Sequence, residues 1–133
     1  MAKILIIEDE PVVVSLLKRI ITGMGHDVVV AEDGVQGLAL AGSENITIIV
    51  SDLHMPGEIS GMDLIRRLRS AKPQCAIVVV SGYPSPDVMG ECEQMGITDF
   101  LTKPFEMTFV QAVIEGILRS RGTAAPTQQK QPL

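Results

Sequence analysis

The sequence has few aromatic residues: of its 133 residues none is tryptophan, one is tyrosine and three are phenylalanine. Hydrophobic residues nevertheless make up 46% of the chain, so valine, isoleucine, leucine, methionine and alanine must fill the interior. An aliphatic interior is typical of a parallel sheet that helices cover on both faces. The composition therefore favours an α/β fold, and the length suits one domain.

Cysteine pairs, long apolar runs and an excess of positive charge are also lacking. Cys75 and Cys92 are isolated thiols with no second pair to complete a zinc site, and we interpret them as reduced. No run of about 18 apolar residues could span a membrane, and the first residues do not resemble a secretory signal, so we expect a cytoplasmic protein. The net charge of −5 argues against direct binding of nucleic acid.

Five short aliphatic runs are each followed by a stretch with helical spacing. Strict alternation of strand and helix predicts an open parallel sheet with right-handed crossovers. The predicted strands are 3–7, 27–31, 46–50, 75–80 and 98–101, and the predicted helices are 11–24, 35–41, 62–70, 86–95 and 105–119.

The apolar pattern ends before the end of the chain. Residues 1–121 are predicted to form the domain. Residues 122–133 are rich in proline, glutamine and threonine and have little to bury, so we expect a disordered polar tail or linker.

Charged and polar residues follow four of the predicted strands. Glu8 and Asp9 follow the first strand, Asp52 the third, Ser81 the fourth and Lys103 the fifth. Ligands of open α/β sheets bind beyond the carboxyl ends of the strands, so we expect these side chains to meet there. Each has a simpler explanation alone, because acidic residues stabilise helix N-termini and Ser-Gly is a common turn. Their combination at successive strand ends is more specific.

The chemistry of this set indicates phosphoryl transfer. Crowded carboxylates need a cation or a shared proton, and Mg²⁺ accepts oxygen ligands while keeping positions for phosphate oxygens. The ammonium of Lys103 and the hydroxyl of Ser81 could contact further phosphate oxygens. Asp52 fits the nucleophile, a carboxylate able to form an aspartyl phosphate.

Four motifs make the chain similar to the receiver domains of two-component signalling: ILIIEDE, SDLHMPG, VVVSGY and DFLTKPF. The resemblance covers residues 3–121. It implies a flavodoxin-like receiver fold, in which a doubly wound five-stranded parallel sheet has the strand order 2-1-3-4-5.

The resemblance also implies a phosphoacceptor and a metal site. Asp52 would accept the phosphoryl group. Mg²⁺ or Mn²⁺ would be the cofactor, held by Glu8, Asp9, Asp52 and the backbone carbonyl of His54. The chain would catalyse its own phosphorylation and dephosphorylation only, and would not be an enzyme that acts on another substrate.

Four further residues receive roles from the resemblance. Ser81 and Lys103 would contact the phosphoryl group, and the Lys103–Pro104 peptide bond would be cis. Ser81 and Phe100 would form the switch, because phosphorylation draws the hydroxyl inward and the aromatic ring follows. The surface of the last two predicted helices and the strand between them would then change.

The partners implied are a sensor histidine kinase or a histidine phosphotransfer protein, and a downstream protein target that the sequence does not identify. No membrane partner is expected. A homodimer could form through the face of the helices over 86–95 and 105–119.

Three other interpretations compete with a phosphorylated switch. A receiver could serve as a scaffold that is never phosphorylated. A phosphohydrolase resembling the haloacid dehalogenase family would require an aspartate two residues after Asp52, where this chain has His54. A flavodoxin-like cofactor binder would require a loop rich in serine, threonine and glycine after the first strand, where this chain has EDEP.

Overall fold

The computed structural model describes residues 2–121, and the predicted tail over 122–133 lies outside the described residues. Strands and helices alternate along the described chain, as the sequence predicts. The strands are β1 (Lys3–Ile7), β2 (Asp27–Ala31), β3 (Ile48–Asp52), β4 (Ala76–Ser81) and β5 (Asp99–Thr102), and the helices are α1 (Pro11–Gly23), α2 (Gly34–Ser43), α3 (Gly61–Ala71), α4 (Pro86–Gln94) and α5 (Met107–Ser120).

The strands form one parallel sheet in the order β2-β1-β3-β4-β5, which confirms the predicted topology. The chain leaves β1 toward β2 on one side and returns to place β3 on the other side. Ile4 of β1 therefore pairs with Val28 of β2 and with Ile48 of β3. The strand order reverses between β1 and β3, where ligands of such sheets bind.

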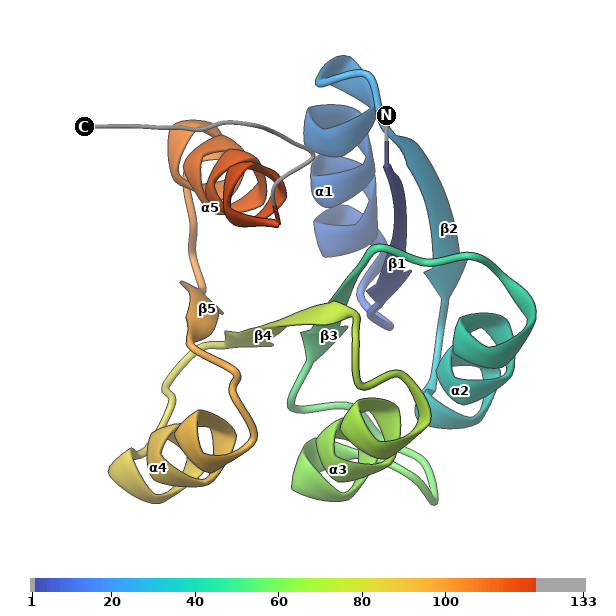
Figure 1. Ribbon diagram of the computed structural model, residues 1–133, viewed down its shortest axis with the longest axis vertical. Helices are drawn as coiled ribbons and strands as arrows, with labels where there is room; N and C mark the ends of the chain where they lie inside the picture. Colours follow the sequence, from blue (N-terminus) through green and yellow to red (C-terminus); the bar gives the residue numbers. More distant parts are fainter. Residues whose placement is uncertain (1, 122–133) are drawn as a thin grey trace.

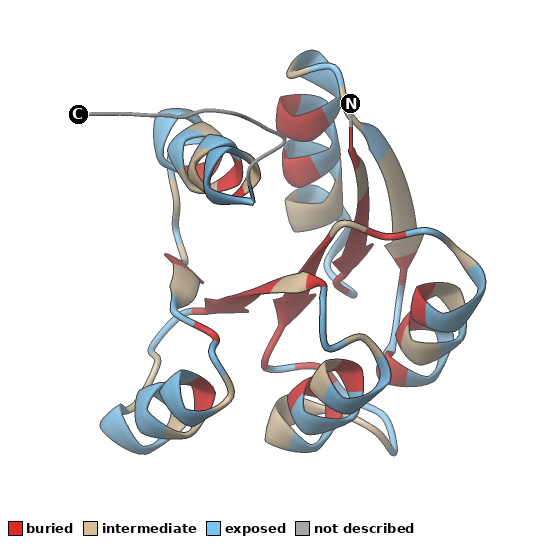
Figure 2. Cartoon of the chain, viewed as in Figure 1, coloured by how far each residue is buried: buried red, intermediate tan, exposed pale blue. Residues whose placement is uncertain are grey.

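Helices cover both faces of the sheet: α1 and α5 lie on one face, and α2, α3 and α4 on the other (Figure 1). Successive side chains of a strand point to opposite faces, so each strand contributes to two cores. Ile4 and Ile6 pack on the side of α1 and α5, while Leu5 and Ile7 pack on the side of α3. The buried strands lie between helices with exposed outer faces (Figure 2).

Three strands end later than the sequence indicates, among them the fifth, which is predicted over 98–101 and is Asp99–Thr102 in the structure. The predicted third strand, 46–50, is Ile48–Asp52 in the structure, and the fourth, predicted over 75–80, ends at Ser81. The reason is register: Asp52 still pairs with Val80, and Ser81 with Thr102. Asp52 and Ser81 are therefore the last residues of strands, where backbone hydrogen bonds fix their positions.

The spacing of apolar residues along α1 and α5 predicts that Val12, Leu16 and Phe109 face the core, and this part of the prediction is wrong. Val12 is 79% exposed, Leu16 is 38% exposed and Phe109 is 50% exposed. Periodicity identifies an apolar stripe on a helix, but contact with the sheet decides which part of the stripe is buried. The buried residues are Leu17, Ile20 and Ile21 in α1, and Val110, Ile114 and Ile117 in α5.

Helix α2 packs closely against the sheet through glycine. A Cβ atom at Gly37 would lie 2.5 Å from Cδ1 of Ile7 in β1. The missing side chain therefore sets the distance between this helix and the strand that ends beside Glu8. Among residues 2–121, no helix combines the length and the apolar character needed to cross a membrane.

Candidate functional site

The polar residues predicted at the strand ends lie at the carboxyl edge of the sheet, and three of them are buried. Glu8 is 1% exposed, Asp52 2% and Ser81 1%. Each is placed by backbone pairing: the N–H of Glu8 donates to the carbonyl of Ala31, while Asp52 and Ser81 end β3 and β4. The N–H of Lys103 donates to the carbonyl of Ser81 at 2.9 Å, which joins the fourth and fifth strand ends.

Lys103 brings the acidic residues together. Its Nζ atom lies 2.7 Å from Oε1 of Glu10, 3.3 Å from Oδ2 of Asp52 and 3.4 Å from Oε1 of Glu8. The lysine follows β5, whereas the three carboxylates follow or end β1 and β3. The charge cluster is thus a product of the parallel sheet, whose strands deliver these residues to one edge.

Burial changes the protonation of this cluster. Removal of Glu8 from water, together with the nearby Asp52 carboxylate, raises its pKa from the ordinary 4.5 to about 7, although a hydrogen bond from the Glu10 N–H opposes the change. Burial also lowers the pKa of Lys103, but its hydrogen bond to Glu10 and the charges of Asp52 and Glu8 outweigh this effect. The pKa of Lys103 therefore lies above its ordinary value, and the lysine stays charged.

The acidic residues fit a hard divalent cation. Glu8, Glu10 and Asp52 each offer a carboxylate oxygen, and these oxygens lie within 4.8 Å of one another. Oε1 of Glu8 is buried and has no hydrogen-bond partner among the described residues. Oxygen donors at this spacing, one of them free of hydrogen bonds, suit Mg²⁺.

The cluster differs from the predicted ligand set at one residue. Asp9 is exposed and is not among the three grouped carboxylates, whereas Glu10 is. The role of Asp9 stays a prediction. Glu10 was missed because its place directly before Pro11 suggested only a helix N-terminus, yet its side chain makes no capping hydrogen bond to α1. The sequence feature that could have identified Glu10 is its place as the third of three consecutive acidic residues after β1.

Asp52 is held by contacts on both of its oxygens. Oδ1 accepts a hydrogen bond from the backbone N–H of His54 at 3.1 Å, and Oδ2 faces Lys103. A carboxylate with fixed oxygens beside a cation can attack an electrophile that arrives at the open edge of the sheet. The Lys103–Pro104 peptide bond is cis.

Ser81 and Phe100 lie on neighbouring strands. Oγ of Ser81 accepts a hydrogen bond from the N–H of Tyr83 at 3.1 Å and lies 3.2 Å from Nε2 of His54. The contact of the His54 ring with Ser81 was not predicted from the sequence, which gave a role only to the backbone carbonyl of His54. Phe100 is partly buried in the core on the α4 side of the sheet.

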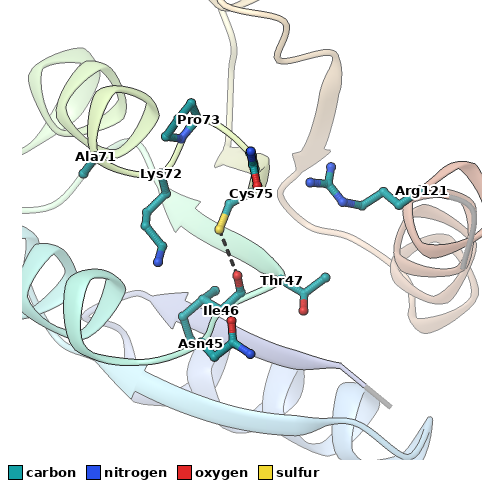
Figure 3. Close-up of a pocket in the computed structure, with 9 residues that line it drawn as sticks. Asn45, Ile46, Thr47, Ala71, Lys72, Pro73, Cys75 and Arg121 are labelled. Carbon is teal, nitrogen blue, oxygen red and sulfur yellow. Dashed lines mark hydrogen bonds between the residues drawn. The ribbon is translucent and has the colours of Figure 1, made fainter.

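A cavity of about 400 Å³ lies at the opposite edge of the sheet, where Lys72 and Arg121 approach Cys75 (Figure 3). The thiol of Cys75 donates to the carbonyl of Ile46 at 2.9 Å, and burial raises its pKa. Lys72 and Arg121 are the C-cap residues of α3 and α5, where cations interact favourably with the helix dipole. Helix capping therefore accounts for these cations without a ligand.

Comparisons with known proteins agree with this geometry. The family model described as the response regulator receiver domain matches residues 4–115. The chain is 33% identical over 129 residues to the alkaline phosphatase synthesis transcriptional regulatory protein PhoP of Bacillus subtilis, covering 96% of this chain and 52% of that protein. It is 28% identical to a cyclic di-GMP phosphodiesterase of Thermotoga maritima, covering 89% of this chain and 31% of that protein. The chain thus spans only about a third to a half of the length of these relatives.

Solved structures show the same likeness. The chemotaxis protein CheY4 of Vibrio cholerae superposes with a TM-score of 0.81 at 27% identity, covering 89% of this chain and 99% of that one. A response regulator protein from Burkholderia pseudomallei, solved with a phosphorylated aspartic acid, a calcium ion and citrate, has a TM-score of 0.75 at 31% identity, with 85% and 66% covered. The chain belongs to the response regulator receiver domain family, whose members are phosphoacceptor switches of two-component signalling and generally bind Mg²⁺ at an acidic pocket.

Proposed function

We propose that residues 1–121 form a receiver domain in which Asp52 accepts a phosphoryl group from the phosphohistidine of a sensor kinase or a histidine phosphotransfer protein. The observation that carries this proposal is the position of Asp52. Its carboxylate is buried at the end of β3, with one oxygen hydrogen-bonded to backbone and the other 3.3 Å from Lys103. Membership of the receiver family supports the same reaction class.

In the proposed reaction an oxygen of Asp52 attacks phosphorus, an oxygen–phosphorus bond forms and the nitrogen–phosphorus bond of the donor breaks. The electron pair of that bond leaves with the imidazole of the donor. Lys103 balances the charge on the phosphoryl oxygens, and the hydroxyl of Ser81 donates a hydrogen bond to one of them. The protein mainly positions these groups, as is typical of phosphoryl transfer.

The metal ligands in this proposal are Glu8, Asp9, Asp52 and the backbone carbonyl of His54, and Mg²⁺ or Mn²⁺ is the cofactor. When bound, such an ion neutralises charge that develops on the transferring group. The buried Oε1 atom of Glu8, which accepts no hydrogen bond among the described residues, supports a cation there. Asp9 is exposed and lies between Glu8 and Glu10 in the sequence.

The output of the switch is a changed surface of α4, β5 and α5, read by a downstream protein or by a second copy of the chain. Phe100 lies in β5 and packs in the core that α4 covers. A movement of Ser81 toward Asp52 would leave space for this ring. Helix α4 has one fully buried residue, Cys92, so it is weakly anchored and suited to shift.

The donor docks beside the site on α1 in this proposal. Val12, in the first turn of α1, is 79% exposed, and Leu16 one turn later is 38% exposed. Exposed aliphatic side chains directly after the acidic cluster suit contact with an apolar partner surface. Phosphotransfer then brings the donor phosphohistidine to the edge where Asp52 lies.

The proposal is tested by labelling with acetyl phosphate and Mg²⁺, followed by intact mass. The wild-type protein and Asp27→Asn, a control at the amino end of β2, should gain one base-labile phosphoryl group. Asp52→Asn should gain none. A wild-type protein that is never labelled, by acetyl phosphate or by a kinase, would instead favour the scaffold interpretation, and labelling of Asp52→Asn would place the acceptor elsewhere.

A further inference from the structure

The hydroxyl of Ser81 is enclosed by contacts that do not involve Asp52. Ser81 is 1% exposed, and its Oγ atom is contacted by the N–H of Tyr83 at 3.1 Å and by Nε2 of His54 at 3.2 Å. His54 comes from the loop after β3, and its own backbone N–H donates to Oδ1 of Asp52. One residue therefore touches both the proposed phosphoacceptor and the proposed phosphate-binding hydroxyl.

The hydrogen-bond partners of the Ser81 hydroxyl indicate which group accepts its hydrogen. A serine hydroxyl has one hydrogen to donate and two lone pairs to accept. The Tyr83 N–H takes one lone pair, and buried polar hydrogens in proteins nearly always find an acceptor. Among residues 2–121, Nε2 of His54 is the one acceptor in contact with this hydroxyl other than its own chain neighbours.

We infer that His54 accepts the hydroxyl hydrogen of Ser81 in the unphosphorylated protein and thereby holds Ser81 away from the phosphoryl site. This inference rests on the proposed function, in which the same hydrogen is donated to a phosphoryl oxygen on Asp52. A hydroxyl has only one hydrogen, so the two acceptors compete for it. His54 is thus a positioning residue that acts through Ser81.

The net free energy of one hydrogen bond sets how strongly His54 opposes movement of Ser81 toward the phosphoryl group. The His54 side chain is exposed, so the ring can turn into water and recover a hydrogen bond there. The net cost of breaking the contact then corresponds to roughly a two- to tenfold change in an equilibrium constant. Loss of the ring nitrogen should favour the phosphorylated state by this factor.

The test measures binding of beryllium fluoride with Mg²⁺, a mimic of the acyl phosphate, at one fixed pH. The amide signal of Tyr83 in NMR spectra reports binding, because this N–H donates to Ser81. His54→Phe keeps an aromatic ring without a nitrogen acceptor and should bind roughly two- to tenfold more tightly than wild type. His54→Gln, whose amide oxygen can accept the same hydrogen, should restore most of the wild-type affinity.

A double-mutant cycle separates this role from a structural one. In a Ser81→Ala background, His54→Phe should leave the affinity unchanged, because the hydrogen in question is absent. In the unliganded protein, the ¹⁵N shift of His54 Nε2 should move on Ser81→Ala substitution. Both results support the inference.

Two outcomes overturn it, and they differ from each other. If wild type binds the mimic but His54→Phe binds no more tightly, or tightens equally without Ser81, the inference fails and the proposed function stands. If neither wild type nor any variant binds the mimic, the proposed function fails and the inference fails with it.

Discussion

Lys103 makes its shortest ion pair, 2.7 Å, with Glu10, although the two residues lie 93 positions apart. The Glu10 side chain is 59% exposed, whereas Glu8 and Asp52, the other carboxylates beside this lysine, are almost fully buried. The lysine thus spans the boundary between the buried part of the cluster and solvent. This arrangement separates the roles of the three consecutive acidic residues after β1.

The first prediction concerns the metal ligands. Among the described residues Asp9 forms no ion pair, so its carboxylate is free to turn to an ion, whereas Glu10 makes the shortest of the three ion pairs with Lys103, at 2.7 Å. Asp9→Asn should weaken Mg²⁺ binding roughly tenfold or more, and Glu10→Gln should change it by less than about threefold. Titration followed by calorimetry or NMR measures both. A larger loss for Glu10→Gln would make Glu10 the ligand in place of Asp9.

The second prediction concerns pH. Folding raises the pKa of Glu8 from 4.5 to about 7, so the folded protein favours the protonated carboxyl group. The stability that this provides is complete below pH 4.5 and is lost as the pH rises to about 7. Without metal, Glu8→Gln should therefore gain up to about 3 kcal/mol in unfolding free energy over wild type between pH 4.5 and 8.

Denaturant unfolding in EDTA at several pH values checks this expectation. Glu93→Gln, which removes an exposed carboxylate of α4, is the control for the change in net charge. Mg²⁺ should reduce the difference at pH 8, because the ion binds the folded wild-type protein. If the unfolding free energies of wild type and Glu8→Gln changed in parallel with pH, burial of the charged Glu8 carboxylate would not destabilise the fold.

The third prediction concerns the close packing of α2. Gly37→Ala places a Cβ atom 2.5 Å from Ile7 Cδ1, so the Ile7 side chain, the helix or the strand must shift. Overpacking should outweigh the gain in helix propensity and destabilise the fold by about 1–2 kcal/mol. Gly42→Ala in the same helix meets no atom within 4 Å and should be neutral or stabilise by about 0.5 kcal/mol. Equal effects of the two substitutions in thermal unfolding would exclude a packing cause.

The fourth prediction concerns the mobility of α4. Gly90 lies inside this helix, and a Cβ atom added there would meet no atom within 4 Å, so Gly90→Ala should stabilise the helix by about 0.5–1 kcal/mol. Amide hydrogen exchange in α4 should slow roughly two- to fivefold, without a change in β4. Glu91→Gln should act in the opposite direction, because it removes the ion pair with Arg66 of α3. Exchange that is unchanged in α4 would show that the helix opens only with the whole domain.

The sequence carried enough information for the arrangement of the fold. Aliphatic runs alternating with helical spacing predicted the parallel sheet, and resemblance to receivers supplied its strand order. Strand boundaries shifted by one or two residues, as at β3, because strand pairing rather than composition decides where a strand ends. The exposed position of Val12 was not predictable, because it depends on how α1 meets the sheet.

The order of residues along the chain was sufficient to predict which side chains reach one edge of the sheet, because parallel strands end together and residues that follow them must meet there. Which of these side chains touch depended on the folded molecule. The pairing of Lys103 with Glu10 and the contact of His54 with Ser81 join residues that are remote along the chain. Their geometry depends on side-chain rotamers and on the spacing of neighbouring strands, which no local pattern of residues encodes.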